Sequence, residues 1–227
     1  MAVILNIETA STNCSVSLCK DGDNVFTKEL NEGFTHAENL HTFIADVLKE
    51  TNIGADQLNA IAVSKGPGSY TGLRIGVSAA KGLSYALNVP LIAINTLQIL
   101  SAKAKSVSNR KDVIFCPMLD ARRMEVYTAM FDGSLTEINQ TQALIISEES
   151  IEQFDTKETI CFFGDGMPKC KELLGRYANH VFIDGLIPSA KEMAQLSEIR
   201  FKNKQFEDVA YFEPFYLKDF MITKKQV

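Results

Sequence analysis

The sequence lacks an excess of basic residues. Its 227 residues include 23 Lys and Arg against 28 Asp and Glu, which gives a formal net charge of −5 at pH 7. A protein that holds nucleic acid on its own depends on clustered Lys and Arg side chains to neutralise phosphates. This balance argues against unaided binding of nucleic acid, so we expect a basic partner to hold any RNA on which this protein acts.

Paired cysteines and long apolar runs are also missing. The five cysteines are an odd number, and no two have the spacing Cys-x-x-Cys, which argues against a disulfide framework and against a zinc knuckle. No apolar run approaches the length that spans a bilayer, and the first residues carry no basic leader. We therefore expect a cytoplasmic protein with no membrane attachment, whose cysteines are mostly small apolar fillers.

Histidine is scarce, with three residues in the chain. His36 and His41 are five positions apart, which separates them by about 140° around a helix, so they cannot chelate one metal ion from one face. Each is expected at the surface or at a helix cap. No Ser-His-Asp or Cys-His set can be assembled by spacing.

What remains is an ordinary globular composition, arranged as alternating strands and helices. Short apolar runs predict strands at 3–7, 14–19, 25–30, 58–64, 91–94, 113–119, 124–131 and 160–163. Apolar residues at spacings of three and four predict helices at 36–51, 71–87, 96–106, 168–177 and 189–204. Strand 14–19 is expected to be half-buried, and Gly54 is expected to cap the helix 36–51.

The polar stretch 106–112 divides the chain into two predicted lobes, 1–107 and 108–227. In each lobe a strand ending in an acid, Glu8 or Asp120, is followed by a second strand. The two similar openings indicate an α/β protein with a duplicated architecture. Glu8 and Asp120 themselves have two interpretations, as water-mediated magnesium ligands or as carboxylates that cap turns.

A glycine-rich segment joins strand 58–64 to helix 71–87. Its glycines and the start of the helix allow two interpretations, a tight turn or an anion-binding loop. It is not a Walker A loop, because no Gly-Lys-Ser/Thr follows. If the loop binds an anion or a nucleotide, the candidate contacts are Gly66, Gly68, Ser69, Thr71, Glu8 and Asp120.

Helix 71–87 carries stripes of small and apolar residues that must be covered on most sides. Burial inside this chain and burial by a partner both remain open, and helix 36–51 would share the partner surface. The residues predicted to line that surface are Leu40, Ile44, Val47, Gly72, Leu73, Gly76, Val77 and Ala80.

The string Gly66-Pro-Gly-Ser-Tyr-Thr-Gly-Leu-Arg-Ile-Gly76, with segments 4–12, 120–127, 164–166 and 214–218, resembles the bacterial TsaB (YeaZ) family over essentially the whole chain. The resemblance implies an actin-like, sugar-kinase-like (ASKHA) fold of two ribonuclease-H-like lobes with mixed sheets. It also implies a role in making N6-threonylcarbamoyladenosine beside the anticodon of tRNAs that read codons starting with A.

In that system a related protein, TsaD, is the catalytic subunit. The resemblance implies that TsaB-like chains pair with TsaD through their first two helices, here 36–51 and 71–87. It further implies contact with the ATPase TsaE and with tRNA through the complex. Homodimers are expected when TsaD is absent, and ATP or ADP would bind at the complex interface rather than to this chain alone.

One departure from TsaD defines the expected role. TsaD carries a metal-binding His-x-x-x-His pair after the strand that follows its glycine-rich helix, and in this sequence Thr96 and Leu100 occupy those two positions. A hydroxyl and an isobutyl group cannot replace two imidazoles on a divalent metal. The sequence therefore predicts a non-catalytic subunit without a metal. The alternative is a nucleotide-binding, ATPase-like or kinase-like member of the same fold class.

Overall fold

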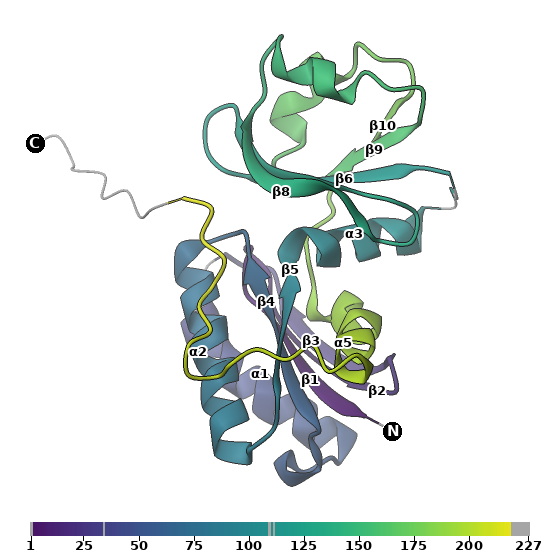
Figure 1. The fold of residues 1–227 in the computed structure, drawn as a ribbon. Coiled ribbons are helices and arrows are strands. Elements are labelled where there is room, and N and C mark those ends of the chain that lie inside the picture. The colour runs from purple at the N-terminus through teal and green to yellow at the C-terminus, as the bar shows by residue number, and fades with distance from the viewer. Residues whose placement is uncertain (1, 34, 109, 111, 219–227) are drawn as a thin grey trace, which may run out of the picture.

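The computed structural model describes residues 2–33, 35–108, 110 and 112–218, which form two lobes, each built on a five-stranded sheet (Figure 1). The first sheet contains β1 (Val3–Glu8), β2 (Cys14–Lys20), β3 (Asp23–Leu30), β4 (Ala60–Gly66) and β5 (Leu91–Asn95). The second contains β6 (Ile114–Asp120), β7 (Glu125–Phe131), β8 (Glu137–Ile145), β9 (Ile160–Phe163) and β10 (His180–Ile183).

The two sheets have the same topology. Their strand orders are β3-β2-β1-β4-β5 and β10-β9-β6-β7-β8. In each lobe the first three strands form an antiparallel meander, and the last two join the free edge of the first strand in parallel. This repeat confirms the α/β class, the mixed sheets and the duplicated architecture that the sequence indicated.

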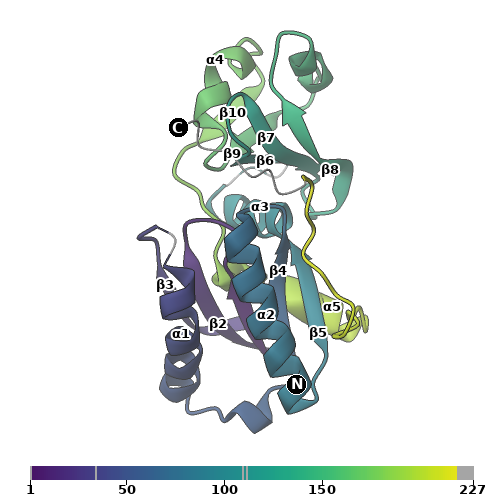
Figure 2. The same ribbon diagram turned by 90° about the vertical axis from the view of Figure 1, so that its left-hand side faces the viewer.

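Helices cover both faces of the first sheet. Helices α1 (His36–Thr51) and α2 (Tyr70–Leu87) lie side by side on one face (Figure 2). The other face is covered by α3 (Thr96–Val107), by the 3-10 turn η4 (Ala190–Glu192) and by α5 (Met193–Lys202). Strand β2 is consequently buried on both faces except at its last residue, so the prediction of a half-buried strand was wrong.

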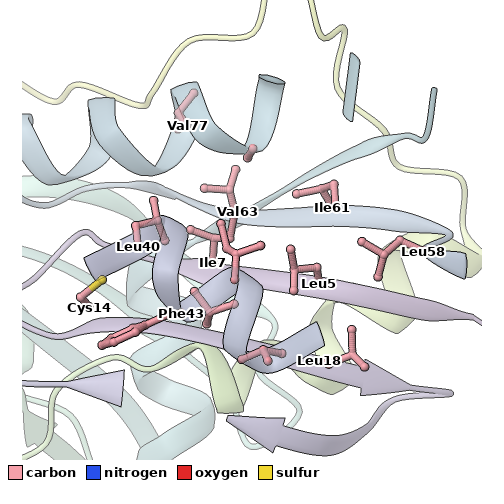
Figure 3. Packing of buried hydrophobic residues seen from close by; sticks show 14 of the residues in the cluster. Leu5, Ile7, Cys14, Leu18, Leu40, Phe43, Leu58, Ile61, Val63 and Val77 are labelled. Carbon is pink, nitrogen blue, oxygen red and sulfur yellow. The ribbon is translucent and has the colours of Figure 1, made fainter. Parts of the chain in front are cut away.

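The main core of the first lobe lies between the sheet and the helix pair α1–α2. Leu5, Ile7 and Val63 point from the strands towards Leu40 and Val77 on the helices (Figure 3). All five side chains are almost completely excluded from water. Burial of a Leu, Ile or Val side chain contributes about 1.5–3 kcal/mol, so this layer fixes both helices on the sheet.

Helix α3 belongs to the cores of both lobes. Ile99 packs with the far face of the first sheet, whereas Leu97 and Leu100 pack with Phe115 and Phe163 of the second sheet. Figure 1 shows α3 between the two sheets. The opposite face of the second sheet is covered by the 3-10 turn η2 (Ser150–Phe154) and by α4 (Lys171–Leu174) with the preceding turn η3 (Pro168–Cys170).

Several element boundaries were predicted closely, and others were not. Helix α1 has the predicted bounds, but its left-handed cap is Asn52 (φ 53°) rather than Gly54. The helix expected at 168–177 is only the short η3–α4 pair. Strands β8 and β10 were missed, because β8 is a largely polar strand at a sheet edge and β10 is four residues long.

The end of the described chain returns to the first lobe. Helix α5 packs on the first sheet, and residues 205–218, called the C-terminal strap here, run past α2 towards the second lobe (Figures 1 and 2). The predicted division into 1–107 and 108–227 separates the two sheets. As a domain boundary it stays a prediction. It assigns α5 and the strap to the second lobe, although both pack on the first lobe.

Candidate functional site

The glycine-rich turn between β4 and α2 lies against the β1–β2 loop. The amide of Ser69 donates to the Ala10 carbonyl oxygen at 2.7 Å, and the Thr9 hydroxyl donates to the Gly72 carbonyl oxygen at 2.8 Å. Ser69 also caps α2, because its hydroxyl oxygen accepts from the Gly72 amide at 3.3 Å. The turn and the first turn of α2 are therefore bonded to this chain's own loop.

Its glycines permit that close approach. A Cβ atom would lie 2.3 Å from the Ala10 carbonyl oxygen at Gly68, and 2.0 Å from the Thr9 carbonyl oxygen at Gly72. At Gly76 it would lie 2.2 Å from the Thr9 hydroxyl oxygen. Internal packing thus accounts for these glycines, as the tight-turn interpretation requires. The anion interpretation of Gly66, Gly68, Ser69 and Thr71 stays a prediction.

Glu8 lies at the end of β1 and is fully buried. One carboxylate oxygen accepts from the Ala10 amide at 2.5 Å, and the other, Oε2, has no hydrogen-bond partner among the described residues. Burial raises the pKa of Glu8 to about 7, although the bond from Ala10 offsets part of this effect. Glu8 accepts from the residue two positions on, as a turn cap does, and its role as a magnesium ligand stays a prediction.

Asp120 occupies the equivalent position at the end of β6. Its carboxylate accepts from the Arg122 amide at 3.1 Å and forms an ion pair with Lys169. It therefore caps a turn, as one of the two interpretations requires. No hydrogen bond or ion pair joins Glu8 to Asp120, and the described ranges contain no group of three or more His, Cys, Asp or Glu residues arranged for a metal ion.

His36 was expected at the surface or at a cap, but it is buried in the first turn of α1. Its Nε2 lies 2.8 Å from the Ser11 carbonyl oxygen. Its ring also lies close to Gly72, where a Cβ atom would be 3.3 Å from the ring carbon Cδ2. Burial lowers the pKa of His36, so the ring favours its neutral form and serves packing between α1 and α2.

The structure corrects the choice of residues for the partner surface. The eight predicted residues all lie inside the chain: Leu40, Ile44, Val47, Gly72, Leu73, Gly76, Val77 and Ala80. Most of them pack on the apolar residues of the strands, whereas Gly72 and Gly76 lie against Thr9. Burial inside this chain, the other alternative, holds for these side chains, whereas partner binding by the helix pair stays a prediction.

The outward face of α2 is a different stripe of the same helix. Its members are small or uncharged, and they are exposed or half-buried: Thr71, Ile75, Ser78, Ala79, Gly82 and Ala86. A Cβ atom at Gly82 would meet nothing within 4 Å, so the space above this position of the helix is open. The spacing of Ala79, Gly82 and Ala86 is the sequence signal that identifies this stripe.

The positions that correspond to the TsaD histidines lie at the start of α3. The Asn95 side chain caps this helix by accepting from the Leu97 amide at 2.8 Å, which places Thr96 in the first turn. Thr96 and Leu100 are both fully buried. Leu100 packs in the core between α3 and the second sheet, so its position is filled by hydrocarbon rather than by a metal ligand.

No helix in the described ranges is both long and apolar enough to cross a membrane.

Two lobes with one repeated sheet order, joined through α3, define a protein of the actin-like, sugar-kinase-like class. The solved structure of YeaZ from Pseudomonas aeruginosa has this fold, with a TM-score of 0.82 and 24% identity over 96% of this chain and 100% of that one.

The family model "TsaD: tRNA N6-adenosine threonylcarbamoyltransferase" matches residues 33–219. Within that family, the chain is 30% identical to the tRNA threonylcarbamoyladenosine biosynthesis protein TsaB of Escherichia coli (strain K12), over 98% of this chain and 97% of the relative. It is 29% identical to the TsaB protein of Bacillus subtilis (strain 168), over 95% and 93%. The chain belongs to the TsaB family.

Proposed function

We propose that this chain is a non-catalytic subunit in N6-threonylcarbamoylation of the adenosine beside the anticodon, in tRNAs that read codons starting with A. Its relatives are named for threonylcarbamoyladenosine biosynthesis, and a transferase of Fusobacterium nucleatum is 30% identical to it over 42% of the chain. The catalytic step belongs to a TsaD-type partner. This chain works in the cytoplasm and completes the complex.

The observation that carries the non-catalytic role is the environment of Leu100. A ligand for a divalent metal needs a lone pair and a path to solvent, and Leu100 offers an isobutyl group enclosed by the second sheet. Thr96 is fully buried one helical turn earlier, so the two positions do not form an open coordination site.

The docking face is the outward side of the helix pair α1–α2. On α2 the stripe itself carries no charge, Arg74 and Tyr85 are exposed beside it, and Gly82 leaves it open to a second backbone. Small residues at spacings of three and four let helices approach closely. A TsaD-type partner would lay its own helix pair on this face, and a second copy of this chain would occupy it when that partner is absent.

Three further contacts belong to the complex. The ATPase TsaE binds to the assembled pair, tRNA binds through the complex, and any ATP or ADP binds at the interface with TsaD rather than to this chain alone. The net charge of −5 supports an indirect contact with tRNA. The alternative of a nucleotide-binding, kinase-like protein has less support, because the glycine-rich turn is packed on the β1–β2 loop.

Reconstitution tests this function. Purified TsaD, TsaE, the threonylcarbamoyl-adenylate donor and tRNA are assayed for modified adenosine with and without this chain. Modification is expected only when the chain is present, and the chain with donor and tRNA alone is expected to give none. Product from the chain alone would overturn the non-catalytic role, and full activity without the chain would overturn the subunit role.

Calorimetry on the isolated chain tests the alternative of a nucleotide-binding protein. ATP with Mg²⁺ is titrated to millimolar concentration, and no heat of binding is expected. Saturable binding would favour the nucleotide-binding protein instead.

A further inference from the structure

The C-terminal strap contains the family-like segment 214–218, to which the proposed function assigns no role. Its first part is bound to the first lobe by backbone atoms. The Glu207 amide donates to the Leu91 carbonyl oxygen at 2.9 Å, and the Lys81 ammonium donates to the Phe212 carbonyl oxygen at 2.8 Å. The strap is therefore fixed to the edge strand β5 and to the middle of α2.

Its second part lies over the glycine-rich turn. The Phe215 amide donates to the Lys65 carbonyl oxygen at 2.7 Å. A Cβ atom at Gly66, whose φ is +110°, would lie 2.8 Å from the Phe215 carbonyl oxygen. Gly66 therefore meets two needs, a left-handed backbone and the close approach of the strap.

The next residues hold the first two turns of α2. The ring of Tyr216 lies 4.8 Å from the ring of Tyr70, measured between centroids, and its hydroxyl accepts from Arg74 Nε at 3.4 Å. The Arg74 guanidinium in turn lies 4.2 Å from the centre of the Tyr70 ring. This stack joins the strap to the helix that carries the proposed docking face.

At Lys218 the strap reaches the second lobe. Its ammonium pairs with the Glu125 carboxylate at the start of β7 and lies 5.9 Å from the centre of the Tyr127 ring. The Lys218 and Glu125 side chains are 37% and 22% exposed, so the pair is partly shielded from solvent and ions. Lys169 holds the same end of β7, because its ammonium donates to the Glu125 carbonyl oxygen at 2.7 Å and pairs with Asp120.

We propose that the C-terminal strap is a clasp between the lobes, closed by the Lys218–Glu125 pair, that couples the position of the second lobe to the first turns of α2. The strap links the two lobes in addition to helix α3. Its contacts form one series, from Glu125 through Lys218 and Tyr216 to Arg74. Opening of the last link loosens the strap and widens the motion relative to α2 that the shared core at α3 allows the second lobe.

Spin labels measure the clasp in the full chain. Lys49→Cys on α1 and Lys157→Cys in the second lobe supply one exposed thiol on each lobe, and the five native cysteines are buried and resist labelling. Lys218→Ala and Glu125→Gln are each expected to broaden the distance distribution between the labels. Both variants should also raise the rates of amide hydrogen exchange in 207–217 and in the first turns of α2 about fivefold. A change of this size is expected from the loss of one partly exposed ion pair.

Two controls distinguish a clasp from general destabilisation. Lys202→Ala removes an ion pair with Glu198 inside the first lobe and is expected to leave the distance distribution unchanged. The charge-swapped double variant Lys218→Glu with Glu125→Lys is expected to restore the narrow distribution. Unchanged distances and exchange in both single variants would overturn the proposal, and so would broadening that the swap fails to reverse.

Discussion

Replacement of Glu8 by glutamine should stabilise the protein at alkaline pH and change its stability little at acid pH. Glutamine has nearly the same shape and keeps an oxygen that accepts from the Ala10 amide. It removes only the group that becomes charged on ionisation inside the core. The comparison therefore isolates the cost of burying a carboxylate whose second oxygen has no partner among the described residues.

The size of the effect follows from the pKa. The pKa of Glu8 is raised from 4.5 to about 7, and each unit corresponds to about 1.4 kcal/mol, which gives a full penalty of about 3 kcal/mol. Between these values the folded protein holds a proton that the unfolded chain has released, so stability falls as pH rises from about 4.5 to about 7 and then levels off. The penalty is about 1 kcal/mol at pH 5 and about 3 kcal/mol at pH 8.

Urea unfolding of the parent and of Glu8→Gln at pH 5 and pH 8 measures this difference. The free-energy difference between the two proteins should shift by about 2 kcal/mol in favour of the variant between the two pH values. Glu32→Gln, in an exposed loop, is the control and should show no such shift. An equal difference at both pH values would refute the argument that burial raises the pKa of Glu8.

Three further outcomes are expected. Gly72→Ala should lower the free energy of unfolding by about 3 kcal/mol or more, because its Cβ would meet the Thr9 carbonyl oxygen. Gly82→Ala, on the open side of the same helix, should raise it by about 0.5–1 kcal/mol. Equal effects of the two variants would contradict the packing of α2. Gly82→Arg should weaken the affinity for TsaD, measured by calorimetry, about tenfold or more. The control Gln195→Arg, on α5, should leave this affinity unchanged. An unchanged affinity in both variants would exclude this face as the docking surface. Because all five cysteines are buried, the native protein should not react with Ellman's reagent at pH 8 and five thiols should react in denaturant; rapid reaction of the native protein would contradict that burial.

The first lobe could be predicted from the sequence because its signals are local. Helix α1 shows a regular apolar spacing and ends before a turn at Asn52, and β1 is an apolar run that ends at a single acid. The second lobe is less regular. Strand β8 lies at a sheet edge and has no buried residue, so it carries no alternating apolar pattern. The helix expected from 168 contains a 3-10 turn followed by a single α-helical turn.

The candidate site was harder to predict, for a physical reason. The apolar and small residues of α2 indicate that the helix is covered on several sides. Composition alone does not determine which stripe of the helix faces the sheet. Val77 and Ala80 pack on apolar side chains of the strands, such as Val63, and α5 covers the opposite face of the same sheet. The buried stripe of α2 is therefore fixed by the assembled sheet. Residues chosen for their apolar character were therefore the core, and the outward face was left to smaller residues.

The same distinction applies to the glycines of the turn. In sequence they resemble a phosphate loop, and both interpretations rest on one property, the absence of a Cβ atom. The structure shows what lies beside each glycine: Ala10 beside Gly68, Thr9 beside Gly72 and the strap beside Gly66. This turn approaches two segments of its own chain, the β1–β2 loop and the strap. These contacts fix the start of α2 on the β1–β2 loop and the strap, which is the internal role that the glycines have in this chain.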